Sequence, residues 1–209
     1  MTAALRPHDL LWPSSQAGLF SAGGVMPDWV NYDWPVVLRR APCNGVLLPV
    51  GLRGAGRSRR HAAFLLSGSV LRCVSPESLI DAWQFHPGLW SFPCVAALQS
   101  ISARMRSLGL PWGPTGSTGF ALASGIAEVR HDSDLDLVVR ASQPLTEQQL
   151  DLLDGLQHLC PDLGCRIDLQ IDTGQGAFAF SEFRRSARRV LLKTASGPVL
   201  IDDPWGKVS

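Results

Sequence analysis

Short hydrophobic stretches bounded by proline and glycine dominate the first third of the chain. Residues 1–35 are expected to be irregular, although residues 8–12 could open the fold as an ordered segment. After them, β-branched and aliphatic residues predict strands over residues 35–40, 45–52 and 62–74. Ser75 followed by Pro76 is typical of a helix start, which predicts a short helix to about Trp83. Two prolines and a glycine within residues 84–93 indicate a linker. We therefore expect a small, strand-rich N-terminal domain over residues 1–88.

Helical periodicity marks the second part of the chain. Apolar residues at steps of three or four predict a helix that Gly109 ends, namely Val95, Leu98, Ile101, Met105 and Leu108. Thr146 to Gln149 fits a helix-capping box. Alternation over residues 165–172 predicts a half-buried strand, residues 176–188 favour a helix, and residues 189–194 and 198–202 a hairpin. We expect a second domain over residues 89–209 with a mixed sheet flanked by helices, so the predicted fold class is α/β (α+β).

An acidic pair lies on an aliphatic strand of this second part. Neighbouring side chains of an extended chain point to opposite faces, so Leu135, Leu137 and Val139 share one face. Asp134 and Asp136 share the other face, where two like charges repel and unpaired carboxylates are costly to bury. We expect a cation to compensate, and Mg²⁺ with oxygen ligands is the usual one. The alternative is a pair of solvent-facing acids on an ordinary amphipathic strand.

A glycine-dense turn precedes the acidic strand. Gly116 and Ser117 lie among Gly113, Gly119 and Gly125. Glycine lets backbone N–H groups approach a ligand closely, and successive N–H groups form a concave anion site. A phosphate-binding turn followed by a metal-binding carboxylate pair is what phosphoryl or nucleotidyl transfer requires. The alternative is a tight turn that needs glycine only for its backbone geometry.

Composition narrows the partners and the compartment. The chain has 209 residues, of which 45% are hydrophobic and 18% charged, as in globular proteins. The net charge of +1 gives no overall field toward nucleic acid or a membrane, and we expect neither as a partner. No apolar run reaches the ~18 residues of a membrane span, and residues 1–12 lack a signal-peptide pattern. The five scattered cysteines favour reduced thiols over a zinc site, which predicts a cytoplasmic location.

The order of these features resembles the nucleotidyltransferase superfamily, in which an acidic pair and a third carboxylate bind divalent metal and a Gly-Ser turn holds the phosphates. The matching positions here are Gly116, Ser117, Asp134, Asp136 and Asp168. Asp172, on the same strand face as Asp168, is the alternative third ligand. Many small nucleotidyltransferases carry an arginine soon after the turn, whereas this chain has Ala123-Ser124-Gly125, so the resemblance implies that phosphate charge is met elsewhere.

Further motifs extend the resemblance over nearly the full length, to the phosphoribosyl-dephospho-CoA transferase family, the holo-acyl-carrier-protein synthases of malonate decarboxylase. The N-terminal third, which generic nucleotidyltransferases lack, is included. The motifs are Pro7-His8-Asp9-Leu10-Leu11-Trp12, Val50-Gly51-Leu52-Arg53-Gly54 with Arg59-Arg60-His61-Ala62-Ala63, Trp112-Gly113-Pro114-x-Gly116-Ser117-x-Gly119-Phe120, Ser133-Asp134-Leu135-Asp136-Leu137 and Asp203-Pro204-Trp205.

This resemblance implies transfer of a prosthetic group from 2′-(5′′-triphosphoribosyl)-3′-dephospho-CoA to a serine of the apo acyl-carrier subunit of malonate decarboxylase. The serine hydroxyl attacks the α-phosphorus and pyrophosphate leaves. Magnesium held by Asp134, Asp136 and Asp168 would neutralise the triphosphate, and Asp168 would help deprotonate the serine. Two rival functions remain: a nucleotidyltransferase that uses an ordinary nucleoside triphosphate and another acceptor, and a non-catalytic module that binds nucleotide or a carrier protein.

Two basic clusters are further binding candidates, for the ligand's phosphates or for an acidic carrier protein. Arg53, next to Gly51 and Gly54, is the best single candidate for substrate binding. Helical spacing spreads the second cluster over more than one face, and solvated loops are the plain alternative for both. The clusters are Arg53, Arg57, Arg59 and Arg60, and then Arg184, Arg185, Arg188, Arg189 and Lys193.

Overall fold

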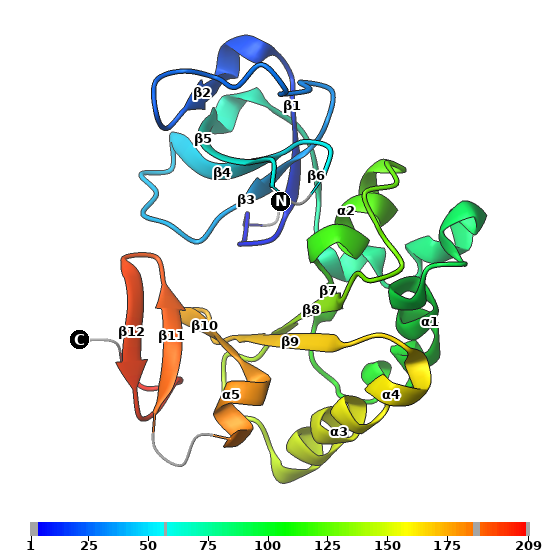
Figure 1. Cartoon of the computed structure of the whole chain (residues 1–209). Helices are drawn as coiled ribbons and strands as arrows, with labels where there is room; N and C mark the ends of the chain where they lie inside the picture. Colours follow the sequence, from blue (N-terminus) through cyan, green and yellow to red (C-terminus); the bar gives the residue numbers. More distant parts are fainter. Residues whose placement is uncertain (1–3, 57, 186–188, 208–209) are drawn as a thin grey trace. The chain divides into compact units, whose positions relative to one another are not determined.

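Two compact units make up the chain, Met1–Ser75 and Pro76–Ser209. The computed structural model describes residues 4–56, 58–185 and 189–207. Each unit contains one six-stranded sheet, and helices accompany the second sheet (Figure 1). The predicted α/β (α+β) class, with a strand-rich first part and a mixed sheet with helices in the second, is therefore confirmed. Among the described residues, no helix is both long enough and apolar enough to cross a lipid bilayer.

The first unit, coloured blue to cyan in Figure 1, is built on an antiparallel sheet. Its strands lie in the order β2-β5-β4-β3-β1-β6. Two of them, β1 and β2, fall within the opening that the sequence analysis predicts to be irregular. The strands are β1 (Leu10–Pro13), β2 (Leu19–Ser21), β3 (Val36–Leu38), β4 (Leu47–Arg53), β5 (Arg60–Leu66) and β6 (Val70–Val74).

One face of this sheet forms the core of the first unit. Alternate residues of β4 and β5 are buried there, including Val50, Leu52, Ala63 and Leu65. Full burial of a valine or leucine side chain contributes about 1.5–3 kcal/mol. The residues between them, such as Gly51, must face the other way because side chains of a strand alternate. The other face of β3, β4 and β5 therefore lies outside the core of the first unit.

A single strand over residues 62–74, as the hydrophobic run suggested, is wrong. The segment forms β5 and β6 with a 3-10 turn between them at Ser67–Ser69. β5 pairs with β2 and β4, whereas β6 pairs with β1 at the other edge of the sheet. The turn is needed because one straight strand cannot serve both edges of a sheet.

The second unit has a mixed sheet in the order β12-β11-β10-β9-β8-β7. Among the described strands of this sheet, the neighbours β8 and β9 are parallel and the other neighbouring strands are antiparallel. The predicted hairpin near the C-terminus is confirmed as β11 and β12. The strands are β7 (Trp112–Pro114), β8 (Leu135–Arg140), β9 (Ile167–Asp172), β10 (Gly176–Ala179), β11 (Val190–Thr194) and β12 (Gly197–Ile201).

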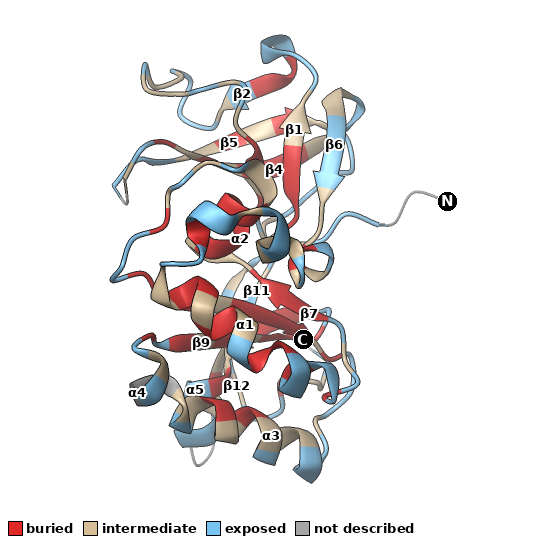
Figure 2. Cartoon of the chain, turned by 90° about the vertical axis from the view of Figure 1, so that its right-hand side faces the viewer, coloured by how far each residue is buried: buried red, intermediate tan, exposed pale blue. Residues whose placement is uncertain are grey.

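Helices α1 and α2 pack against β8, α5 packs against β9, and α3 contacts α1. The apolar stripe predicted for the first helix is confirmed, because Val95, Leu98, Ile101 and Met105 are fully buried. In Figure 2, buried residues are coloured red, and they lie in α1 and along β7 and β9. The helices are α1 (Pro93–Arg106), α2 (Gly116–Ser124), α3 (Glu147–His158), α4 (Cys160–Leu163) and α5 (Phe180–Arg185).

The structure also confirms the helix-capping box that the sequence predicts at Thr146 to Gln149. The Thr146 hydroxyl accepts a hydrogen bond from the Gln149 backbone N–H at 3.3 Å, and the Gln149 side chain accepts one from the Thr146 N–H at 2.9 Å. This reciprocal pair satisfies two backbone donors at the start of α3. Gly109, expected to end the first helix, has a left-handed φ of +70° that favours glycine.

Two predicted helices are wrong in part. The segment after Ser75 forms two 3-10 turns, Pro76–Leu79 and Ala82–Phe85, instead of one α-helix. Residues 176–179 are a strand because they pair with β9 and β11, so α5 begins only at Phe180, and residues 186–188 lie outside the described part of the chain.

The division between the two units falls at Ser75 and Pro76, whereas the sequence analysis placed the domain boundary after residue 88. Pro76 is tied to the second unit by close packing. A Cβ added at Gly113 of β7 would lie 2.0 Å from the Pro76 carbonyl oxygen, so glycine is required for this approach. Residues 76–88, which the sequence analysis assigned to the first domain, therefore belong to the second unit.

Candidate active site

Parallel pairing of β8 and β9 brings the predicted carboxylates together. Asp136 lies directly opposite Asp168 in the register of the two strands. Residues opposite one another in a sheet project from the same face, with Cβ atoms about 5 Å apart. Asp134 immediately precedes β8, and the next residue, Leu135, donates its N–H to the Arg166 carbonyl at 2.8 Å. The sequence predicted the face of each acid, and the strand pairing makes them neighbours.

Arg166 joins two of these carboxylates. Its Nη2 donates to Asp134 Oδ2 at 2.8 Å and to Asp168 Oδ2 at 2.7 Å. The hydrogen bond with Asp134 and the negative charge of Asp168 raise the pKa of the Arg166 guanidinium, so it stays protonated. The three side chains are 65%, 39% and 44% exposed, in the order Arg166, Asp134 and Asp168, so solvent screens the pairs and each contributes at most about 1 kcal/mol.

The role of Arg166 was missed by the sequence analysis, although a signal for it exists. In the alternating segment Arg166-Ile167-Asp168, the first and third side chains must share a face. The second contact, to Asp134, depends on strand pairing and is invisible in a single sequence.

Gly116 lies against the Asp136 side chain. The Thr115 N–H donates to the Asp136 carbonyl at 2.8 Å, which fixes the turn beside the acidic strand. A Cβ added at Gly116 would lie 1.9 Å from Asp136 Oδ2 and 2.7 Å from its Cγ, and the residue has φ +58°. Both the close approach and the left-handed backbone therefore require glycine at this position.

The predicted Gly-Ser turn is the first turn of helix α2. The first N–H groups of a helix lack intrahelical acceptors, and together with the helix dipole they attract anions. The N-cap residue Thr115 makes no side-chain capping hydrogen bond to them. Gly119 holds the helix close to β7, since a Cβ there would lie 2.5 Å from the Pro114 carbonyl oxygen. The N-terminus of α2, at Gly116 and Ser117, therefore lies next to Asp136.

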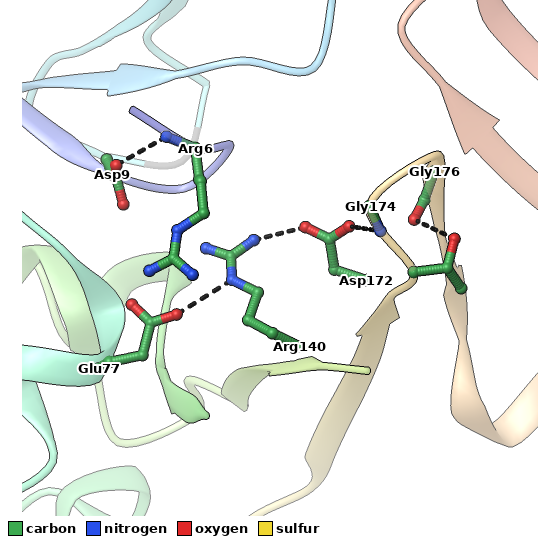
Figure 3. Close-up of polar contacts among 8 residues, drawn as sticks. Arg6, Asp9, Glu77, Arg140, Asp172, Gly174 and Gly176 are labelled. Atoms are coloured by element: carbon green, nitrogen blue, oxygen red, sulfur yellow. Dashed lines mark hydrogen bonds and ion pairs between the residues drawn. The ribbon is translucent and has the colours of Figure 1, made fainter. Parts of the chain in front are cut away.

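Asp172, the alternative third ligand, serves a structural ion pair. Figure 3 shows Arg140 between the carboxylates of Glu77 and Asp172, with distances of 3.1 Å and 2.5 Å. The other Asp172 oxygen accepts from the Gly174 N–H at 2.9 Å. The side chains of Arg140 and Asp172 are only 9% and 6% exposed. Because both oxygens of Asp172 already have partners, Asp168 is the better candidate for the third ligand.

A buried thiol lies near the acidic pair. Burial raises the pKa of Cys94 on α1, and the negative charge of Asp136 raises it further. The thiol therefore stays protonated and is a poor nucleophile.

The donor set fits a hard divalent cation. The described residues contain no group of three His, Cys, Asp or Glu side chains already arranged to hold a metal. Two carboxylate oxygens nevertheless converge on one cationic nitrogen, that of Arg166, with Asp136 opposite Asp168. Carboxylate oxygens converging on positive charge are the ligands that Mg²⁺ prefers. Magnesium binding by Asp134, Asp136 and Asp168 stays a prediction.

The two basic clusters have different environments. In the second unit, Arg184 forms an ion pair with Asp154 at 2.7 Å and Arg189 one with Asp202 at 3.1 Å. The hydrogen bond with Asp154 raises the pKa of Arg184. These pairs neutralise part of the cluster, which weakens the docking interpretation. Arg188 of this cluster and Arg57 of the first lie outside the described residues.

In the first unit, Arg53 lines a groove on the sheet face opposite the core. The structure adds Arg39, which the sequence analysis did not select, because strands β3 and β4 are neighbours only in the folded sheet. The groove is lined by Val37, Arg39, Gly51, Leu52, Arg53, Arg60, His61 and Ala62.

Comparison with known families matches both units. Residues 80–204 match the family described as phosphoribosyl-dephospho-CoA transferase MdcG C-terminal domain, and residues 6–76 match the corresponding N-terminal domain family. The gap between the two matches, residues 77–79, lies within a few residues of the division between the compact units at Ser75 and Pro76.

Individual proteins are similar over nearly their whole length. A phosphoribosyl-dephospho-CoA transferase of Pseudomonas putida strain GB-1 is 42% identical over 97% of this chain and 96% of its own. Proteins of the same name from Azotobacter vinelandii and Klebsiella pneumoniae strain MGH 78578 are 40% and 39% identical, each over 98% of this chain and over 96% and 98% of their own. No solved structure matches.

Proposed function

The chain belongs to the phosphoribosyl-dephospho-CoA transferase family, whose members attach the prosthetic group of the malonate decarboxylase acyl carrier protein, and from this premise we propose how the chain performs that transfer. Its second unit carries the reaction, with triphosphoribosyl-dephospho-CoA as donor and a serine of the apo carrier subunit as acceptor. The observation that supports this assignment is the in-register pair Asp136 and Asp168 beside the N-terminus of α2.

The proposed reaction exchanges one phosphorus–oxygen bond for another. The serine oxygen of the carrier forms a bond to the α-phosphorus, and the bond from that phosphorus to the leaving pyrophosphate breaks. The serine proton passes to a carboxylate, and we assign this role to Asp168, which is partly exposed and therefore within reach of a bound partner. The product is a phosphodiester that links the prosthetic group to the carrier.

The chain's own groups would hold the triphosphate in two ways. The N–H groups at Gly116 and Ser117 begin α2 and would donate to phosphate oxygens. Arg166 would give up its contacts to Asp134 and Asp168 when the ligand binds, and its guanidinium would then be available to a phosphate. This would supply the positive charge that the sequence lacks at Ala123-Ser124-Gly125.

Magnesium is the proposed cofactor. Asp134, Asp136 and Asp168 would hold it, and when bound it would supply charge neutralisation for the triphosphate and for the leaving pyrophosphate. The three carboxylates would in turn need this charge, because like charges on one strand face repel.

A mass-spectrometric transfer assay tests the proposal. The protein, magnesium, the apo carrier subunit and triphosphoribosyl-dephospho-CoA are mixed, and the carrier is weighed. We expect a mass gain equal to the prosthetic group with release of pyrophosphate, and no gain with Asp134→Asn or Asp136→Asn variants that remain folded. Arms with ATP or CTP as donor should give no gain. Full activity of either Asn variant would refute the site, and transfer only from an ordinary nucleotide would refute the donor.

A further inference from the structure

Charge is divided unevenly between the two units. Residues 1–75 contain eight arginines, no lysine, three aspartates and no glutamate, a formal net charge of +5. Residues 76–209 contain eleven basic and fifteen acidic residues, a formal net charge of −4. The net charge of the whole chain is therefore close to zero although the first unit is strongly basic. A basic surface attracts anionic ligands.

The arginines of the first unit meet on one sheet face. Val37, Gly51 and Ala62 lie side by side across β3, β4 and β5. Two residues further along the same face of β4 and β5, Arg53 lies opposite Arg60.

Arg39 completes the set from β3. It follows Val37 by two residues, and its N–H donates to the Pro49 carbonyl at 2.8 Å, which continues the strand pairing. Its side chain reaches over Gly51, since a Cβ added at Gly51 would lie 3.5 Å from Arg39 Cδ. We call the resulting hollow the arginine groove. It has a floor of small or aliphatic residues, three guanidinium groups that come from β4, from β5 and from the residue that follows β3, and a volume of about 330 Å³.

The chemistry of the arginine groove selects a phosphate group. None of the described residues that line it is acidic. Guanidinium groups present planar forks of N–H donors that match phosphate oxygens in pairs. The concave shape and the absence of a side chain at Gly51 suit a small ligand group better than the convex surface of a protein partner.

We propose that the arginine groove binds the diphosphate group of a nucleotide-type ligand. Resting on the proposed function, that ligand is the dephospho-CoA part of the donor, which carries a diphosphate separate from its triphosphate. The donor thus has two phosphate clusters, and the arginine groove recognises the diphosphate.

Calorimetric titration of the full chain with dephospho-CoA, with EDTA present and no magnesium, tests this inference. Dephospho-CoA lacks the triphosphate, and without magnesium the acidic site of the second unit does not attract it. We expect wild type to bind, the double variant Arg53→Gln/Arg60→Gln to bind at least tenfold more weakly, and Asp134→Asn/Asp136→Asn to bind like wild type. Inorganic pyrophosphate should compete with dephospho-CoA in wild type.

Two further variants separate the groove from overall charge and from misfolding. Gly51→Val fills the floor with a residue that strands favour and leaves the charge unchanged, and we expect it also to weaken binding at least tenfold. Arg72→Gln removes one positive charge from the same unit, half of what the double variant removes, at an exposed arginine that stacks on Trp12 at 4.6 Å outside the groove. It should bind within twofold of wild type. Thermal melts identify any variant that has unfolded.

Several outcomes would overturn the inference. One is that wild type does not bind dephospho-CoA. Another is that both groove variants are folded and bind it as tightly as wild type does. A third is that Arg72→Gln loses as much affinity for dephospho-CoA as the groove variants do. Groove variants that bind dephospho-CoA normally but lose affinity for the apo carrier would show a protein-docking surface instead.

Failure of the groove inference is distinct from failure of the proposed function. A wild type that binds dephospho-CoA in the groove without transferring any group would refute only the function, and transfer with a groove that binds nothing would refute only the groove.

Discussion

Gly116→Ala is the sharpest test of how the turn and the acidic strand work together. The new Cβ would lie 1.9 Å from Asp136 Oδ2 and 2.7 Å from its Cγ, whereas real Cβ contacts essentially never fall below 3.0 Å. The carboxylate must therefore move away by about 1 Å, and rotation of its tip alone does not relieve the contact at Cγ. A displacement of about 1 Å in a catalytic group costs about 100-fold in rate.

The same substitution also strains the backbone. A non-glycine residue at φ +58° costs about 1–2 kcal/mol, which corresponds to about 2–8 °C in Tm for a protein of this size. Gly125→Ala is the matched control, because Gly125 ends the same helix with φ +73° and the nearest atom to its added Cβ is His86 Cε1 at 3.9 Å. Both variants should lose similar stability, and only Gly116→Ala should lose transfer activity.

Initial rates of carrier modification by mass spectrometry, with thermal melts on the same samples, separate the two effects. We expect about 100-fold slower transfer by Gly116→Ala than by Gly125→Ala at a temperature where both are folded. Rates within threefold of each other would refute the reasoning, because the position of the Asp136 carboxylate beside Gly116 would then not matter for catalysis.

Three further predictions concern stability, metal binding and thiol reactivity. Arg140→Ala leaves the buried Asp172 uncompensated and should lower the free energy of unfolding, measured in urea, by about 3–5 kcal/mol. Arg106→Ala breaks a half-exposed pair with Asp81 and should lower it by less than about 1 kcal/mol. Equal losses in the two variants would contradict the structural role of Arg140. Arg166→Gln removes the cation that competes for Asp134 and Asp168, so calorimetry should show magnesium binding about two- to fivefold more tightly in the absence of substrate; weaker binding would show that Arg166 does not compete. Burial, with the charge and hydrogen bonding of Asp9, raises the pKa of Cys73 to about 11, so its alkylation should be slow at pH 8 and rise about tenfold per pH unit up to that value. Asp9→Asn should speed the reaction at pH 8, and a plateau near pH 9 in wild type would contradict the raised pKa.

Features with a short sequence range were predictable from the sequence. The buried stripe of α1, the capping box of α3, the terminal hairpin and the opposite faces of Leu135 and Asp136 all depend on residues a few positions apart. The period of a helix or strand determines which side chains share a face, and that period is a property of the local backbone. The same local rule puts Asp134 and Asp136 on one face, because they are two positions apart in an extended segment.

Errors arose where partners distant in sequence decide the outcome. Residues 176–179 have a pattern compatible with a helix but form β10, because hydrogen bonds to β9 and β11 outweigh local preference. The segment 62–74 divides because β5 and β6 serve different edges of one sheet. Asp172 qualifies as a metal ligand by its strand face alone, but folding brings Arg140 to it from 32 positions away.

The sequence by itself determined the chemical character of the candidate site: which residues are acidic, which face they occupy and where glycine permits a close approach. Tertiary structure alone decided that Asp136 lies opposite Asp168, that Arg166 bridges two carboxylates, and that Arg39, Arg53 and Arg60 surround one groove. The physical reason is that strand register is set by hydrogen bonds between segments far apart in the chain. Local periodicity determines the face of a strand, and only strand pairing determines its neighbours.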